Sequence, residues 1–123
     1  MATDLDARST SAHRTAVTQS LQDVARFLVD HLGMALTAHI AKVDRRTITR
    51  WAEGSPARAE GEKNLRAAFQ VFQLIQTVDA PHTVRAWFMG MNPQLEDVSP
   101  AEALAEGRYR EVMAAARAFV SGG

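Results

Sequence analysis

The stretch LTAHIAKVDRRTITRWAEG, residues 36–54, decides the fold because two short helical patterns meet in it with almost no sequence between them. In the first pattern, Met34–Ala41, small or apolar residues recur at helical spacing and leave room for a second helix to cross closely. Asp44 then stands where a side-chain oxygen can cap a second helix, which we expect to begin at Arg45. The stretch therefore predicts a helix-turn-helix.

The second helix of this pair is expected to have two chemically different faces. Ile48 and Trp51 are three residues apart and are predicted to face inward. The outer face then carries arginine and hydroxyl side chains, namely Arg45, Arg46, Thr47, Thr49 and Arg50. Such side chains contact guanine edges, phosphates and thymine methyl groups when a helix lies in a major groove. We therefore predict a DNA-binding surface; the alternative is a small helical corner whose arginines are simply solvated.

Length and composition indicate a single compact unit. The chain has 123 residues, of which 46% are hydrophobic and 23% charged. It contains no unbroken apolar run of the roughly 18 residues that a membrane span needs. The absence of cysteine excludes disulfides, cysteine-ligated zinc and thiolate catalysis, and is typical of a reducing compartment. Because nothing at the start of the chain looks like an export signal, we expect a cytoplasmic protein that does not associate with membranes.

The formal net charge is zero, but the charges are distributed unevenly along the chain. Residues 42–66 contain seven basic and four acidic residues, whereas residues 96–111 contain five acidic and two basic residues. A zero net charge argues against a strongly basic, non-specific nucleic-acid binder. The two segments, with an excess of three charges of opposite sign, are expected to face different partners.

Apolar periodicity predicts further helices on both sides of the central pair, so the expected fold class is all-α. Residues 1–14 are polar, and we expect a flexible lead-in without a packed element. A helix is predicted over residues 15–32, with Gly33 as its stop. After a connector over residues 55–61, a longer helix is predicted over residues 62–78, with an apolar face wide enough to contact several neighbours.

The C-terminal part is predicted to hold three shorter helices. Pro81 and Pro100 each stand where a proline loses no helical hydrogen bond, so each marks a helix start. Ser99 is in place to cap the second of these helices, with Glu102 in the capping-box position. The last helix is expected to begin at about Arg108 and to continue almost to the end of the chain.

No residue pattern indicates catalysis. His31 and His39 are eight residues apart and lack the four-residue spacing and the supporting carboxylate of a helical metal site. The histidines and carboxylates also form no recognisable nucleophile–base set. We therefore expect a protein that is not an enzyme and that needs no metal or other cofactor.

One set of residues in the C-terminal part resembles a known family by its order and spacing. The set comprises Trp87-Phe88, Asn92-Pro93, Leu95, Ser99-Pro100, Ala103-Leu104, Gly107 and Val112. It is similar to the toxin-binding domain of the MbcA/ParS/Xre-type antitoxins, a family that also places a Xre-like helix-turn-helix upstream. Together these patterns divide the chain into the lead-in over residues 1–14, a helix-turn-helix region over residues 15–58 and a helical toxin-binding domain over residues 59–123.

Members of this family are all-helical bacterial antitoxins, and the resemblance implies the same function here. Such antitoxins bind and silence a cognate toxin whose RES domain degrades NAD, and they commonly repress their own operon. The segment implied to fill the active-site cleft of the toxin consists of Ala118, Phe119, Val120, Ser121, Gly122 and Gly123. The implied partners are a RES-domain toxin and operator DNA, in a homodimer or in a larger hetero-oligomer with the toxin.

The sequence leaves a second function open. A stand-alone transcriptional regulator would use the same basic helix on DNA, with C-terminal helices that serve only to dimerise. An amphipathic terminal helix with Phe119 as an aromatic anchor suits a groove in a partner, but a frayed C-terminus has the same composition. Deletion of residues 118–123 separates the two functions, because it would not affect the stand-alone regulator.

Two positions depart from the family pattern. Met91 stands where the family often has proline, and Asp97 stands where glycine is frequent. Aspartate tolerates a left-handed backbone better than most residues, so the second departure is mild. The first departure is expected to loosen the turn that precedes Asn92.

Overall fold

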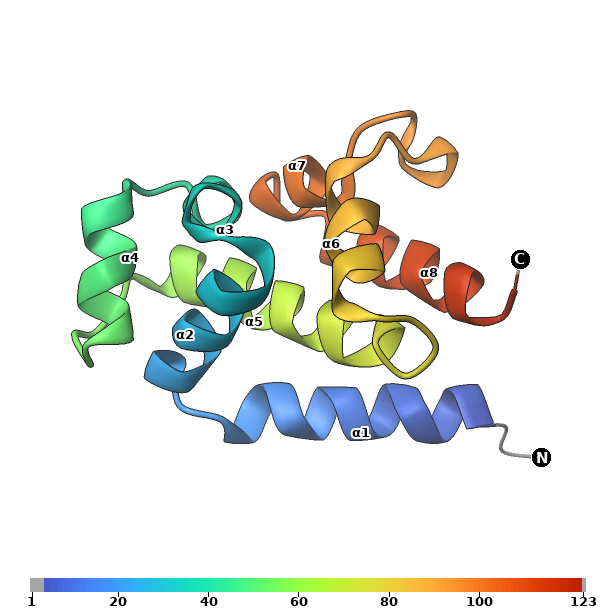
Figure 1. Ribbon diagram of the computed structural model, residues 1–123, viewed down its shortest axis with the longest axis horizontal. Coiled ribbons are helices and arrows are strands. Elements are labelled where there is room, and N and C mark those ends of the chain that lie inside the picture. The colour runs from blue at the N-terminus through green and yellow to red at the C-terminus, as the bar shows by residue number, and fades with distance from the viewer. Residues whose placement is uncertain (1–3, 123) are drawn as a thin grey trace.

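The computed structural model describes residues 4–122 as a purely helical protein (Figure 1). These residues form eight α-helices and one short 3₁₀ helix, and no strand occurs among them. The elements are α1 (Asp4–Thr18), α2 (Leu21–Leu32), α3 (Met34–Ala41), α4 (Arg45–Ala52), α5 (Ala59–Ile75), α6 (Pro81–Met89), η1 (Pro93–Leu95), α7 (Pro100–Ala105) and α8 (Tyr109–Val120). The predicted all-α fold class is confirmed.

Helix α5 runs through the middle of the molecule, and most of the other helices pack against it (Figure 1). It contacts α1, α2, α3, α7 and α8, so the wide apolar face predicted for this helix does have several neighbours. Its buried apolar residues are Leu65, Ala68, Phe69, Val71, Phe72, Leu74 and Ile75. They belong to one continuous core to which the helices before and after α5 also contribute.

Helix α1 shows that the prediction of a flexible lead-in is wrong for residues 4–14. This helix packs on α5 and α8, and it buries Ala12 and Ala16. A contact face made of alanines produces little contrast with its polar surroundings, so the helical periodicity was weak in the sequence. Residues 1–3 lie outside the part of the chain that the structure describes.

The prediction of a single helix over residues 15–32 is also wrong, because the helix is interrupted between α1 and α2. Helix α1 ends at Thr18, and Ser20 starts a new helix by accepting a hydrogen bond from the backbone N of Asp23 at 3.0 Å. Val17, which lies within the predicted helix, is 58% exposed. The two-residue break allows α1 to leave the direction of α2 and to lie along α5 (Figure 1).

Arg66 of α5 holds the C-terminal end of α1. Its Nη1 donates hydrogen bonds to the carbonyl oxygens of Ala16 and Gln19, both at 2.8 Å, and its Nε donates to Glu62 at 2.8 Å. The last carbonyl groups of a helix lack intrahelical partners, and a cation beside them also interacts favourably with the helix dipole. This contact joins residues 50 positions apart, so no local pattern in the sequence reveals it.

Two further arginines bind the C-terminal carbonyl groups of neighbouring helices in the same way. Arg26 Nε donates to the carbonyl oxygen of Ala52 at 2.9 Å, where α4 ends. Arg85 Nε donates to the carbonyl oxygen of Leu32 at 3.1 Å, where α2 ends. These contacts position the ends of α4 and α2 against the rest of the molecule.

Helix α5 begins at Ala59, so the connector predicted over residues 55–61 is shorter than expected. Gly61 lies in the first turn of α5, directly beneath the indole ring of Trp51. A Cβ atom at this glycine would lie 2.5 Å from Cη2 of Trp51, so any other residue would push the ring and α4 away. At the other end, Val78 lies beyond α5 and is 42% exposed, so it is not part of the apolar face predicted for this helix.

The predicted starts of α6 at Pro81 and of α7 at Pro100 are confirmed. Ser99 Oγ accepts from the backbone N of Glu102 at 3.1 Å, as expected of a cap. The Glu102 carboxylate does not complete the capping box, however, because it pairs instead with His39, whose Nε2 lies 2.7 Å from Oε2. This pair connects α7 to α3.

A second polar link joins α8, α5 and α3. The hydroxyl of Tyr109 donates to Oδ1 of the buried Asn64, and Nδ2 of Asn64 donates to the carbonyl oxygen of Ile40 at 2.9 Å. Burial is the main cause that raises the pKa of Tyr109, and the negative charge of Glu60 raises it further. The hydroxyl therefore stays protonated and can donate this hydrogen bond. Because the buried amide of Asn64 uses both its oxygen and its nitrogen in hydrogen bonds, it fixes the relative positions of these helices.

The turn between α6 and α7 is closed around Asn92. Its carbonyl oxygen accepts from the backbone N of Leu95 at 2.9 Å and of Asp97 at 3.0 Å, and Leu95 is fully buried. Glu96 and Asp97 both have a left-handed backbone, with φ of 59° and 65°, so Asp97 adopts the conformation for which glycine is favoured. These bonds close the turn although the residue before Asn92 is Met91 and not a proline, and Met91 itself is 81% exposed.

Candidate nucleic-acid interface

Helices α3 and α4 are joined by a turn of three residues at one end of the molecule (Figure 1). Lys42 adopts a left-handed backbone with φ of 60°, and the backbone N of Val43 donates to the carbonyl oxygen of Ala38 at 3.1 Å, which ends α3. Asp44 Oδ1 then accepts from the backbone N of Thr47 at 2.8 Å, so the predicted cap of α4 is confirmed. In Figure 1, α3 is seen nearly end-on while α4 lies in the plane of view, so the two helices cross steeply.

Helix α4 has one buried face and one exposed face, as predicted. Ile48 is fully buried and Trp51 is 4% exposed, and both belong to the core. The outward residues are Arg45, Arg46, Thr49 and Arg50, while Thr47 is half-buried. The hydroxyl of Thr49 donates to the carbonyl oxygen of Arg45 at 3.1 Å, so its own oxygen remains able to accept.

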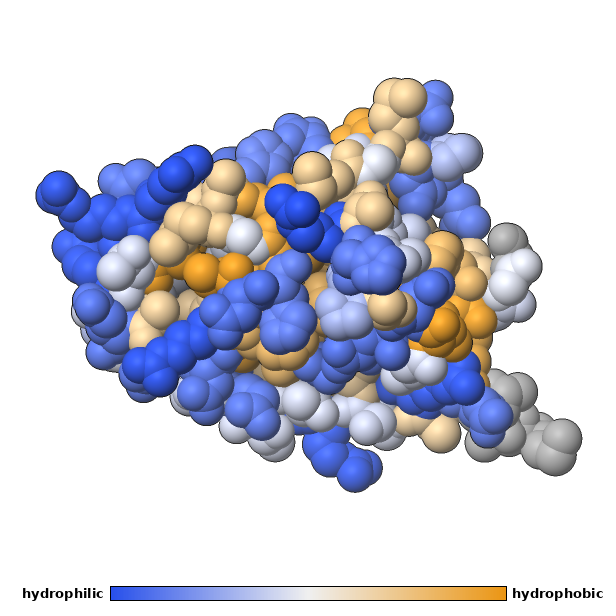
Figure 2. Space-filling view, viewed as in Figure 1, coloured by the Kyte–Doolittle hydropathy of each residue, from blue (hydrophilic) through white to orange (hydrophobic). Residues whose placement is uncertain are grey.

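The three arginines of α4 form no close ion pair with any residue from 4 to 122. Among residues 4–122, no carboxylate lies within 4.0 Å of the guanidinium groups of Arg45, Arg46 or Arg50, and these groups make no hydrogen bond. Figure 2 shows hydrophilic side chains gathered over the end of the molecule where α4 lies. The positive charge of the three α4 arginines is therefore available to an anionic partner.

Asp44 is the acidic residue closest to these arginines in the sequence, and it serves as the cap. Hydrogen bonding to Thr47 lowers the pKa of Asp44, and the positive charges of Arg46 and Arg50 lower it further. The carboxylate therefore stays ionised at neutral pH. An ionised cap stabilises the first turn of α4, where the helix dipole is positive.

A hollow lies between α4, the end of α3 and the start of α5. We call it the α4 hollow; its volume is about 350 Å³, and its walls include Lys42, Thr47, Arg50, Arg58, Glu60 and Gly61. Lys42 and Arg58 were not among the predicted site residues, although both belong to the basic segment recognised in the sequence. They were missed because only the fold brings the turn before α4 and the start of α5 to the same side of that helix.

The predicted toxin-binding residues lie at the C-terminal end of α8. Ala118, Phe119 and Val120 form its last turn and are half-buried, whereas Ser121 and Gly122 are exposed. Phe119 packs against Trp87 of α6, with ring centroids 6.3 Å apart. Gly123 lies outside the described residues.

The last turn of α8 is thus a continuation of the helix and not a separate tail. Apolar side chains reach the surface beside this end of α8 (Figure 2), and Ser121 Oγ donates to the carbonyl oxygen of Arg117 at 2.8 Å. Arg117 in turn donates to Ser9 Oγ at 2.8 Å, which ties this end of α8 to α1. The segment from Ala118 to Gly122 is accessible but only partly anchored.

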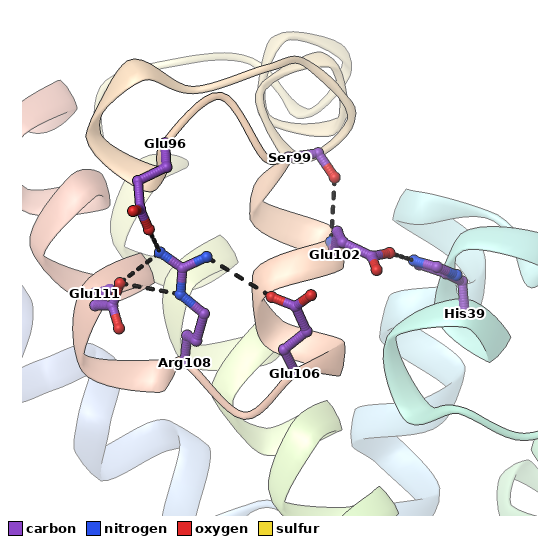
Figure 3. Close-up of polar contacts among 7 residues, drawn as sticks. All are labelled: His39, Glu96, Ser99, Glu102, Glu106, Arg108 and Glu111. Carbon is purple, nitrogen blue, oxygen red and sulfur yellow. Dashed lines mark hydrogen bonds and ion pairs between the residues drawn. The ribbon is translucent and has the colours of Figure 1, made fainter.

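The acidic segment is organised around one arginine. Arg108 forms ion pairs with Glu96, Glu106 and Glu111, with N···O distances of 3.0 Å to Glu96 and 3.6 Å to Glu106 (Figure 3). Hydrogen bonding to Arg108 lowers the pKa of Glu111, and the same contact raises the pKa of Arg108. Three carboxylates around one cation leave this surface acidic, in contrast to α4.

Neither histidine on α2 or α3 takes part in a metal cluster. His31 Nδ1 lies 2.8 Å from the carbonyl oxygen of Phe27 and its ring stacks on that of Phe27, with centroids 4.0 Å apart. His39 pairs with Glu102, as seen in Figure 3. In the described part of the chain, no group of three or more histidine, cysteine or acidic side chains is arranged to hold a metal ion.

Comparisons with known proteins returned no match. No protein-family model matches the chain, and neither the curated proteins nor the solved structures include a significant match. Within residues 4–122, no helix combines the length and the apolar character that crossing a membrane requires.

Proposed function

We propose that this protein binds operator DNA through α3 and α4, which act as a Xre-like helix-turn-helix. The observation that carries the proposal is the outer face of α4, where Arg45, Arg46 and Arg50 are exposed and form no close ion pair or side-chain hydrogen bond among residues 4–122. On the opposite face, Ile48 and Trp51 fix the helix to the core. A rigid helix that presents unpaired arginines and threonines suits a major groove, where arginine reads guanine and both residue types bind phosphates.

We further propose that the protein is an antitoxin of a bacterial toxin–antitoxin system. The support is the resemblance of the C-terminal residues to MbcA/ParS/Xre-type antitoxins, together with the accessible last turn of α8. In this proposal, Phe119 and its neighbours up to Gly123 enter the cleft of a RES-domain toxin that degrades NAD, while α4 represses the operon. A half-buried aromatic residue beside exposed small residues suits such a contact, because aromatic anchors dominate many interfaces.

DNA binding is tested with a duplex from the region upstream of the protein's own gene, by fluorescence anisotropy. We expect Arg46→Ala to weaken binding by about 1–3 kcal/mol, which is the range for an arginine that reads a base. Arg110→Ala is the matched control, since Arg110 is an exposed arginine on α8, away from the proposed surface, and should leave the affinity unchanged. Equal effects of the two substitutions, or no binding by the native protein, would contradict a site on α4.

The antitoxin role is tested by copurification with the product of the adjacent gene and by relief of its toxicity in bacteria. We expect the full chain to form the complex and a chain lacking residues 118–123 to lose it while still binding DNA. A deletion without effect on either the complex or growth would instead favour the stand-alone regulator. Because residues 118–122 are exposed or half-buried, circular dichroism of the shortened chain serves as the folding control.

A further inference from the structure

The α4 hollow is lined by more positive than negative side chains. Lys42 from the turn, Arg50 from α4 and Arg58 from the start of α5 contribute three cations to its walls. Of the described residues that line the hollow, Glu60 alone is acidic. Three elements that are separate in the sequence therefore direct positive charge into one concave site, where a shared anion would be attracted by all of them.

The cations of the hollow are poorly neutralised by the protein itself. Lys42 Nζ lies 4.0 Å from Glu60 Oε1, and both side chains are more than half exposed, so the pair is weak. For Arg50 and Arg58, no ion pair or side-chain hydrogen bond is formed with any residue from 4 to 122. This differs from Arg66, which lies only two turns further along α5 and is fully engaged by carbonyl and carboxylate groups.

The start of α5 forms part of the wall of the hollow. Arg58 occupies the cap position of α5, but its side chain makes no capping bond, so the first N–H groups of the helix have no side-chain partner. Gly61 is part of the wall, and the absence of a Cβ lets Trp51 close the hollow on one side. The helix dipole adds to the cations, because the positive end of a 17-residue helix points toward the site.

We propose that the α4 hollow binds a phosphate group, with Arg58, Arg50 and Lys42 as its cationic ligands. Guanidinium groups match phosphate oxygens in charge and geometry, and several cations around one site suit a group that carries more than one oxygen acceptor. The phosphate comes either from the DNA backbone beside the groove occupied by α4, which rests on the proposed function, or from a small phosphorylated ligand. Both sources share the same chemistry at the site.

Phosphate binding is tested first without DNA, by NMR titration of the full-length ¹⁵N-labelled protein with inorganic phosphate against sodium chloride of equal ionic strength. The reporters are the indole N–H of Trp51 and the backbone N–H of Gly61, because both residues line the hollow. We expect saturable shifts of these signals with phosphate and not with chloride, while the indole signal of Trp87 on α6 stays in place. No difference between phosphate and chloride would overturn the proposal.

Substitutions inside and outside the hollow test whether the phosphate-induced shifts arise from binding at this site. Arg58→Gln should abolish the saturable shifts, whereas Arg14→Gln, at an exposed arginine of α1, should leave them intact. Lys42→Asn is a second variant that removes a cation while tolerating the left-handed backbone at this position. Arg58 has an exposed side chain that forms no ion pair or side-chain hydrogen bond with residues 4–122, so the substitution is not expected to unfold the protein. Retention of the shifts in both hollow variants would overturn the proposal.

The salt dependence of DNA binding distinguishes the two sources of phosphate. If the hollow holds a backbone phosphate, Arg58→Gln lowers the slope of log K against log salt by about 1, and Arg14→Gln does not change it. If the slope is unchanged but inorganic phosphate still shifts Trp51 and Gly61 in the DNA complex, the occupant is a small phosphorylated ligand. If no duplex binds while the phosphate titration still depends on Arg58, the proposed DNA function fails and the phosphate site stands.

Discussion

The arginines of α4 differ from Arg66 of α5 and from Arg108 at the start of α8 in whether the fold neutralises their charge. Arg66 lies in the same basic segment as Arg45, Arg46 and Arg50, yet it binds the C-terminal carbonyl groups of α1 and a carboxylate. Arg108 is likewise surrounded by three glutamates. A paired arginine contributes to the structure and an unpaired one remains available to a partner, so the pairing of each cation indicates function better than the local charge.

The largest expected effect is on stability, and it comes from removing the buried Trp51 ring that fixes α4 to the core. Trp51→Ala should lower the free energy of unfolding by about 3–5 kcal/mol, because a large buried ring is replaced by a cavity. The ring is 4% exposed and rests on Gly61, so little can move in to fill the space. Urea denaturation followed by circular dichroism measures the change, and a loss below about 1 kcal/mol would mean that α4 is not held by this contact.

The next effect concerns the paired arginine of α5. Arg66→Met should lower the free energy of unfolding by about 1.5–3 kcal/mol, because charged hydrogen bonds to the end of α1 are lost. Lys63→Met is the control, since Lys63 is an exposed cation of the same helix without an ion pair among residues 4–122. The same urea measurement applies, and similar stabilities of the two variants would show that α1 is not fixed by Arg66.

Substitution of an unpaired arginine should have little effect on stability but a clear effect on DNA binding. Arg50→Ala is expected to change the free energy of unfolding by less than about 0.5 kcal/mol, as is usual for surface positions without special contacts. If the proposed function holds, the same variant weakens duplex binding by about 1–3 kcal/mol. Parallel urea denaturation and anisotropy measurements test both parts; a destabilised variant would mean that Arg50 is paired in the folded protein after all.

The smallest effect is the pH dependence of the cap at the start of α4. The pKa of Asp44 is lowered from its usual value of 3.8, so ionised Asp44 contributes stability that is present above that value and is lost as pH falls through the folded-state pKa. Asparagine also caps helices but does not titrate. The difference in unfolding free energy between the native protein and Asp44→Asn should therefore shift in favour of the variant between about pH 6 and pH 3 in urea titrations. A shift in favour of the native protein on acidification would contradict this assignment.

Local patterns predicted the elements whose stability is decided locally. The cap at Asp44, the inward pair Ile48 and Trp51, and the proline starts of α6 and α7 depend on residues within one or two turns of each other. Helix α1 was missed because its alanine face and its anchor at Arg66 carry no such local pattern. The capping box at Glu102 was only half formed for a related reason, since His39, 63 residues away, binds the carboxylate.

The sequence by itself determined the all-helical fold class and the two faces of α4, because helical spacing and capping act over a few residues. Only the tertiary structure decided which cations are neutralised and which are not. Arg66 and Arg58 belong to the same basic segment, but Arg66 binds the end of α1 whereas Arg58 lines a hollow. Electrostatic partners are chosen by distance in space, and in a protein built around one central helix that distance depends on how the whole chain packs.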